Sequence, residues 1–170
     1  MLIDDIFKNV ACRLYGGTLF HEQLIQSFSF LCLEGYKFNQ VEHYEEEVEG
    51  FHRLLDYYMA HYDKLIQLDG VPAIKVLPSE WYGHTRFEVT PYEKRNAISN
   101  IYKEWLNWET ETKQLLEKSY QDLMDLKEVA AATEIKHYIE NVDIELAELK
   151  QKYLELEAIN YDLVFIVDEQ

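Results

Sequence analysis

The sequence predicts an all-α protein built as a four-helix bundle, and three observations support this. The chain of 170 residues has only 6 Gly and 3 Pro, so few positions oblige a helix to stop. Apolar side chains recur at alternating intervals of three and four residues over four long segments, which is the periodicity of amphipathic helices. Hydrophobic residues form 48% and aromatic residues 14% of the composition, enough for the core of a single helical domain over 1–170.

The first two helices are expected over about 18–38 and about 40–68, as a helical hairpin. Gly16 and Gly17 should break the chain before the first of them. Thr18 then offers a side-chain oxygen that can cap the first helix at its N-terminus.

The second helix has Asn39 as a candidate cap, and Asp69 with Gly70 should end it. Pro72 follows and prevents the helix from continuing. In the crossover over 70–90 the apolar residues alternate with a period of two on either side of a Gly-containing turn. This pattern fits a short β-hairpin or an extended segment.

The third helix, over about 91–126, has the strongest start signal in the chain. Thr90, Pro91 and Glu93 form a capping box with proline at the first helical position. The fourth helix is expected over about 133–158, where the apolar seam is most regular.

The tail over 159–170 contains a β-branched apolar run between acidic residues, which could add a C-terminal strand. Two helical hairpins joined by one long crossover form a four-helix bundle, and the crossover makes the second and third helices roughly parallel. An extended helical hairpin that dimerises is the alternative architecture.

The charge of the chain excludes several classes of partner. Lys and Arg number 16 against 32 Asp and Glu, a net charge of −16, and this negative field repels nucleic-acid phosphates and anionic lipids. We therefore expect no direct nucleic-acid binding and no membrane association. No run approaches the roughly 20 apolar residues of a membrane span, and Asp4 and Asp5 stand where a signal peptide would be basic. These features favour a cytoplasmic protein, with Cys12 and Cys32 as buried, reduced thiols.

Acidic residues gather over 42–49 and again from Glu134 to the end, where ten acids face three lysines, and this favours a binding function. The segment 42–49 carries five glutamates and no Lys or Arg, which fits either a solvated helix face or a ridge that attracts a basic protein surface. The second reading predicts a non-enzymatic, cofactor-free inhibitory or regulatory protein of phage or mobile-element type, docking on a basic surface that itself binds nucleic acid. Two aromatic residues at the crossover tip either fold back over the bundle or contact the partner. The candidate binding residues are Glu42, Glu45, Glu46, Glu47, Glu49, Trp81 and Tyr82.

Enzymatic activity is not indicated by any motif. The serines lack a nucleophile-elbow context, and no Gly-rich loop follows a predicted strand to hold phosphate. The sequence therefore offers no catalytic residues.

A metal centre is the alternative hypothesis, because two Glu-x-x-His tetrads lie on the second and fourth helices. Dinuclear carboxylate proteins use one such tetrad on each of two helices and a single glutamate on each of the others. The predicted apolar seams nevertheless turn the tetrad carboxylates toward the flanks of their helices. The candidate metal ligands are Glu22, Glu49, His52, Glu109, Glu134 and His137.

Glu109 differs from the other candidates because it lies on the seam of its helix, one turn from Trp105 and Thr112. A buried carboxylate without a partner costs several kcal/mol. We expect Glu109 to pair with His21, to bind a metal, to bond to a tyrosine hydroxyl, or to lie where the bundle opens.

Two segments resemble the second helix of ferritins, bacterioferritins and the DNA-protecting miniferritins. They are EEEVEGFHRLL over 45–55 and DKLIQLDGVP over 63–72. The family's metal-binding histidine falls on Gly50 when RLL sets the register and on Tyr57 when LDGVP sets it. The resemblance implies a ferritin-like bundle that binds iron for oxidation or storage, and a homo-oligomer.

Overall fold

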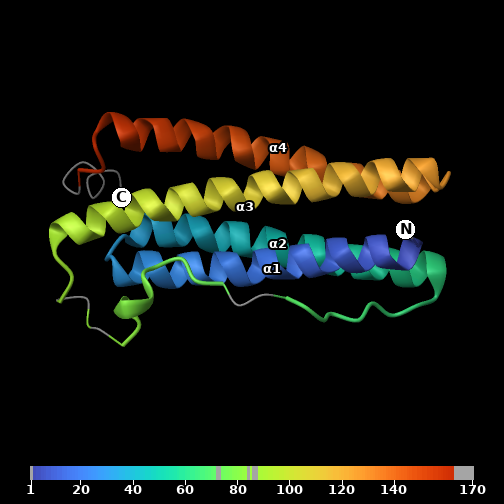
Figure 1. The fold of residues 1–170 in the computed structure, drawn as a ribbon, viewed down its shortest axis with the longest axis horizontal. Coiled ribbons are helices and arrows are strands. Elements are labelled where there is room, and N and C mark those ends of the chain that lie inside the picture. The colour runs from blue at the N-terminus through green and yellow to red at the C-terminus, as the bar shows by residue number, and fades with distance from the viewer. Residues whose placement is uncertain (1, 72–73, 84, 86–87, 163–170) are drawn as a thin grey trace.

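Two antiparallel helical hairpins lie side by side along the length of the protein (Figure 1). The computed structural model describes residues 2–71, 74–83, 85 and 88–162. No strand forms within these ranges, so the predicted all-α four-helix bundle is confirmed. The helices are α1 (Ile3–Phe30), α2 (Glu34–Tyr62), α3 (Pro91–Asp125) and α4 (Val129–Ala158), with a short 3-10 helix, η1 (Ser79–Trp81), in the crossover.

The crossover determines the direction of the helices. It leaves the end of α2 and returns along α1 to the start of α3 (Figure 1), with Lys8 bound to Asp69 at one end of this path and Gln23 bound to Tyr82 near the other. α2 and α3 therefore run in the same direction, as the sequence predicts. α1 also packs against α3, which joins the two hairpins.

The predicted helix break at Gly16 and Gly17 is wrong, because both glycines lie inside α1. A Cβ on Gly16 would stand 3.0 Å from the ring of Trp108, and a Cβ on Gly17 would stand 2.7 Å from Oε2 of Glu47. Glycine at these positions therefore allows close approach by α3 and α2 rather than a turn. Thr18 does not cap a helix, and its hydroxyl donates to a backbone carbonyl within α1.

The turn between α1 and α2 comes earlier than predicted, so the first helix ends at Phe30 rather than near 38. Cys32 takes a left-handed conformation (φ 61°), and the backbone N–H of Leu33 donates to the carbonyl of Phe28 (2.9 Å). Buried Leu31 and Leu33 anchor this turn while Cys32 is exposed, contrary to the expected buried thiol.

Three other boundaries also differ from the prediction. Asn39 is internal to α2, which begins at Glu34, and α2 ends at Tyr62 because Asp63 adopts a left-handed conformation (φ 51°). Asp69 and Gly70 therefore belong to the crossover. α4 begins at Val129 rather than near 133.

The capping box before α3 is present as predicted. The hydroxyl of Thr90 accepts from the N–H of Glu93 (3.2 Å), and the Glu93 carboxylate accepts from the N–H of Thr90 (2.7 Å). In the described part of the crossover, η1 replaces the possible β-hairpin. The possible C-terminal strand over 163–167 lies outside the described residues.

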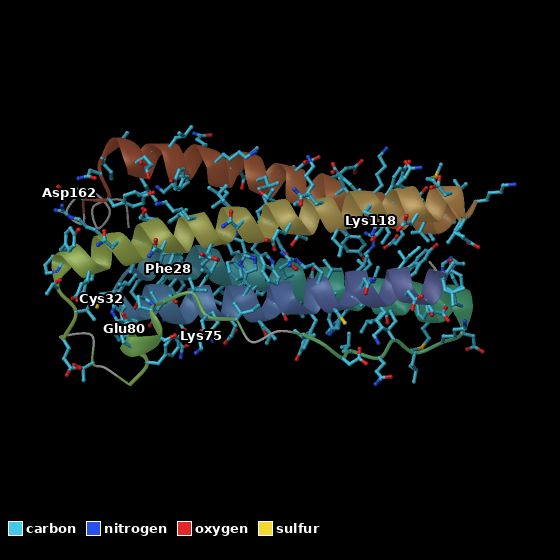
Figure 2. All side chains as sticks on the ribbon, viewed as in Figure 1. Phe28, Cys32, Lys75, Glu80, Lys118 and Asp162 are labelled. Atoms are coloured by element: carbon cyan, nitrogen blue, oxygen red, sulfur yellow. The ribbon has the colours of Figure 1, made fainter. Side chains whose placement is uncertain are left out.

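The apolar core is divided into two clusters along the bundle. One cluster joins the second half of α1 to the first half of α3 and includes the fully buried Phe28, which Figure 2 labels. The other joins the first half of α1 to the second half of α2 and the first half of α4. Buried polar side chains, among them His21, Gln40 and Glu109, lie between the clusters. Within the described residues no helix is both long and apolar enough to cross a membrane.

Candidate metal centre

Each of the four helices contributes an ionisable side chain to the polar layer between the two apolar clusters: His21 from α1, Glu47 from α2, Glu109 from α3 and Glu145 from α4. The side chains of His21 and Glu109 are fully buried. Ligand atoms of His21, Glu47 and Glu109 all lie within 4.8 Å of one another. His21 Nε2 is 3.9 Å from a Glu109 oxygen and 3.8 Å from Oε1 of Glu145. The four helices therefore direct oxygen and nitrogen ligands toward one point.

Several of these converging atoms have no hydrogen-bond partner among the described residues. They are Nε2 of His21, both carboxylate oxygens of Glu109 and Oε1 of Glu145. A buried polar group left unpaired costs roughly 1–3 kcal/mol, and more when it is charged. Unpaired ligand atoms that face one another are the arrangement that a cation site requires. The indole Nε1 of Trp105 is unpaired as well, and its N–H opposes the rise in pKa that burial causes in Glu109 and Glu145.

Gln40 fixes the orientation of the His21 ring. Its amide oxygen lies 3.0 Å from His21 Nδ1, and both side chains are buried. An amide oxygen can only accept, so Nδ1 carries the proton and donates it to Gln40. The lone pair of Nε2 then faces Glu109 and Glu145, as a metal ligand requires.

Burial changes the pKa of every ionisable group in the centre. It lowers the pKa of His21 to about 4 and raises the pKa of Glu47 to about 8 and of Glu145 to about 7. Burial also raises the pKa of Glu109 well above its usual value, and the neighbouring carboxylates of Glu145 and Glu47 add to that rise. At neutral pH the metal-free centre therefore holds protons that a divalent cation would displace.

His43 adds a second imidazole at the edge of the centre. Its ring stacks on His21 with centroids 5.6 Å apart, and its Nδ1 lies 3.4 Å from Oε1 of Glu145. Trp105 presents its ring at a steep angle to both imidazoles. The aromatic ring limits how far either imidazole can rotate.

Arg13 brings a positive charge close to the centre. Its guanidinium lies 3.6 Å from the ring centroid of Trp108 and donates to the Thr112 hydroxyl and to the Trp108 carbonyl, both at 2.7 Å. These contacts hold it beside the turn of α3 that carries Glu109. This positive charge lowers the pKa of Glu109 and of Glu47, and so opposes the rise in pKa that burial causes.

The centre opens to solvent between α2 and α4, where a groove has a volume of about 720 Å³. His43, Glu47 and Glu145 from the centre line this groove, and further acidic residues surround them. A second hollow of about 350 Å³ reaches His43, Trp105 and Glu145 from the side nearer the α1–α2 turn. The acidic groove therefore gives cations access from solvent to Glu47 and Glu145, the two carboxylates of the centre that line it.

Of the six predicted metal ligands, the structure brings only Glu109 into the centre. Glu22, Glu49, His52 and His137 are exposed. Glu49 and His137 line the groove between α2 and α4 but do not belong to the cluster of converging ligand atoms. Glu134 is buried but already paired. Its carboxylate accepts from Arg53 (2.7 and 3.0 Å) and from the hydroxyl of Tyr138 (3.3 Å).

The predicted docking residues do not form one surface. Trp81 is buried and packs on Phe30, with ring centroids 6.0 Å apart, and the Tyr82 hydroxyl donates to Gln23 (3.1 Å). The aromatic tip therefore folds back over the bundle. Glu47 turns into the centre, while the other acidic residues of the ridge remain exposed: Glu42, Glu45, Glu46 and Glu49.

Glu47, His43 and Glu145 were not predicted as ligands, although one signal for Glu47 was available. The RLL register places the family's histidine on Gly50, so the glutamate of a Glu-x-x-His motif falls three residues earlier, on Glu47. No side chain stands at Gly50, and the hydroxyl of Tyr138 donates to its carbonyl (3.1 Å). The second half of the family's motif is therefore absent.

Comparison with known proteins gives a clear answer for the fold. No protein-family model and no curated protein sequence matches the chain. A crystal structure of PmFTN, a ferritin, with one glutamate changed to histidine and soaked in iron for 3 h has a TM-score of 0.78 at 13% identity, covering 96% of this chain and 94% of that one. The same variant soaked for 45 min has a TM-score of 0.79 at 14% identity, covering 98% and 95%. A glutamate-to-alanine variant soaked for 5 min has a TM-score of 0.77 at 13% identity, covering 95% and 92%.

These likenesses show that the chain has a ferritin-like fold. The expectation of an inhibitory protein that docks on a basic surface is wrong. The chain folds like a ferritin, and its helices gather carboxylates and a histidine into a buried centre. The expectation that no cofactor is bound is not supported either, because a histidine and two carboxylates converge as a metal site would require.

Proposed function

We propose that this protein binds iron at the centre formed by His21, Glu47, Glu109 and Glu145. The observation that carries the proposal is the convergence of unpaired, buried ligand atoms from different helices on one point. Crystals of the structurally similar PmFTN variants were soaked in iron, which supports the choice of metal.

The chemistry of the ligand set suits iron. Carboxylate and imidazole ligands bind ferrous iron, whereas thiolates favour softer ions. The two cysteines do not belong to the cluster of potential ligands in the described residues. When bound, iron would supply a one-electron redox couple. The chain's own residues orient the imidazole through Gln40, admit the ion through the acidic groove and flank it along the bundle with the two apolar clusters.

The direct test of this proposal is an anaerobic titration with Fe(II) in 150 mM salt, in which calorimetry measures the affinity. Wild-type protein should show a tight site, and Glu109→Gln should weaken it at least a hundredfold because the substitution removes a buried anionic ligand and preserves its shape. Glu45→Gln is the matched control, since Glu45 lies exposed on α2. Equal affinities for the wild type and Glu109→Gln would overturn the proposal.

Oxidation and storage are extensions of the same proposal, each with its own measurement. Admitting dioxygen to the loaded protein should produce ferric absorbance if the bound ion is oxidised. Storage of many ions would require a hollow homo-oligomer, and light scattering of the purified protein measures its mass directly.

A further inference from the structure

The centre lacks the ligand pattern of a site for two metal ions. A dinuclear site in a four-helix bundle uses a glutamate from each of two helices and a Glu-x-x-His motif from each of the other two. In this protein α2, α3 and α4 each supply one carboxylate, and α1 supplies an imidazole instead. Neither Glu47 nor Glu145 has a histidine three residues later, where the sequence has Gly50 and Glu148.

The α1 face toward the centre leaves no room for the missing carboxylate. Arg13, Gly17 and His21 succeed one another at intervals of four residues along this face. At Gly17 a Cβ would already stand 2.7 Å from Oε2 of Glu47, so no side chain fits there. Two turns of α1 thus present a guanidinium, an empty position and an imidazole.

Gly50 leaves a similar gap on α2, and α4 covers it. A Cβ on Gly50 would lie 3.5 Å from the ring of Tyr138, whose hydroxyl donates to the Gly50 carbonyl. A longer side chain at this position would have to displace that ring. The histidine of a Glu-x-x-His motif is therefore missing on α2, and the second imidazole near the centre, that of His43, lies one turn before Glu47 instead of one turn after it.

The charge of the centre also matches a single ion. Arg13 also pairs with the exposed carboxylate of Glu111 (3.4 Å), outside the centre. Counted with the centre's own carboxylates, when Glu47, Glu109 and Glu145 are ionised, the guanidinium leaves a net charge of −2. One divalent cation neutralises this charge, and a second would leave an excess of positive charge among buried groups, which is costly. Stacking on Trp108 and two hydrogen bonds of 2.7 Å keep the guanidinium in place.

We infer that the centre binds one divalent ion, and that Arg13 adds to the missing ligands in disfavouring a second ion, because its positive charge repels cations at the centre. The inference rests on the proposed function and concerns the same site. It assigns Arg13 the role of a residue that weakens cation binding at the centre, and it makes this protein mononuclear within a dinuclear architecture.

Stoichiometry and Arg13 variants test the inference together. Anaerobic calorimetry with Fe(II), repeated with Co(II) and monitored by its visible absorbance, should give one tight ion per wild-type chain in 150 mM salt. Arg13→Gln should bind that ion at least threefold more tightly, because the repelling charge is gone. Arg13→Lys keeps the charge and should stay within twofold of wild type. A purely structural role for Arg13 would instead weaken binding in both variants.

The outcomes separate this inference from the proposed function. Two tight ions per wild-type chain would overturn the inference and leave iron binding intact. Unchanged or weaker binding in Arg13→Gln would overturn the role of Arg13. No tight Fe(II) or Co(II) site in the wild type would overturn the proposed function itself, and the inference with it. The wild-type measurement decides the stoichiometry even if a variant fails to fold.

Discussion

The Glu47 carboxylate on α2 lies so close to Gly17 on α1 that a Cβ at residue 17 would be 2.7 Å from its Oε2. Glycine at this position therefore makes space for a ligand contributed by the neighbouring helix. The contact links a residue that looks like a helix breaker in the sequence to the geometry of the candidate metal centre.

Gly17→Ala should move Glu47 and reduce Fe(II) affinity at least tenfold. Global stability should change much less, because overpacking costs about 1–3 kcal/mol while replacing glycine within a helix returns about 1 kcal/mol. Anaerobic calorimetry and urea unfolding measure the two effects. Gly50→Ala is the control, since its Cβ meets Tyr138 at an ordinary 3.5 Å. Equal affinity loss in both variants would contradict the prediction.

The metal-free protein should lose stability as the pH rises from 6.5 to 8. The folded protein raises the pKa of Glu145 to about 7 and of Glu47 to about 8, whereas glutamates in the unfolded chain ionise near 4.5. A carboxyl group whose pKa is raised by folding stabilises the folded protein fully when the pH is below the pKa that the group has in the unfolded chain. This stabilisation is lost as the pH rises through the pKa that the group has in the folded protein. His21, with a pKa lowered to about 4, acts oppositely, but only below about 6.5.

Thermal unfolding in a chelator at pH 6.5 and 8 measures this effect. We expect Tm to fall by several degrees, since 1 kcal/mol shifts Tm by about 2–4 °C in a chain of this size. Saturating Fe(II), added anaerobically, should remove the fall because the ion replaces the protons. Glu47→Gln should flatten the metal-free profile. A Tm that is constant or rises with pH in the chelator would show that Glu47 and Glu145 are not held protonated in the metal-free folded protein.

Gln40 should control metal affinity through His21 without touching the ion. Gln40→Met removes the acceptor of the Nδ1 proton, and loss of such supporting hydrogen bonds typically costs 10–100-fold in metal affinity. Gln40→Glu retains an acceptor and should remain within threefold of wild type. NMR of the His21 ring nitrogens checks the tautomer directly. Wild-type affinity in Gln40→Met would show that the hydrogen bond does not orient the ring.

Glu134 should behave as a structural residue, not as a metal ligand. Glu134→Ala removes the partner of Arg53 and of the Tyr138 hydroxyl and should lower the free energy of unfolding by about 1–3 kcal/mol. The stoichiometry of Fe(II) binding should not change. The exposed Glu140 on the same helix provides the control, since Glu140→Ala should cost less than about 0.5 kcal/mol. If Glu134→Ala no longer bound Fe(II), the prediction would be wrong and Glu134 would be a metal ligand.

The sequence predicts the bundle well, because long apolar periodicities and the capping box at Thr90 are local signals. Helix ends were harder to predict. The α1–α2 turn has neither Gly nor Pro at its centre, where Cys32 takes the left-handed conformation between two buried leucines. Gly17 shows the opposite error: the sequence predicts a helix break at this glycine, whereas the structure uses it inside α1 to make room for Glu47 of another helix.

The metal centre was only partly predictable for a related reason. Glu109 could be identified because it is an acid on an apolar seam. Glu47 and Glu145 each lie one residue from an apolar side chain, Val48 and Leu146 respectively, on helices rich in exposed acids. Periodicity alone cannot separate a carboxylate at the border of the buried face from one in solvent, so their convergence appears only when the helices are packed.

Anomalous diffraction at the iron absorption edge, from crystals of this protein loaded anaerobically with Fe(II), tests the central claim most directly. The claim predicts one strong peak per chain between the four helices, within bonding distance of His21 Nε2 and of the carboxylates of Glu47 and Glu109. Peaks confined to exposed glutamates such as Glu42 and Glu46, with His21 and Glu109 still unpaired, would contradict it.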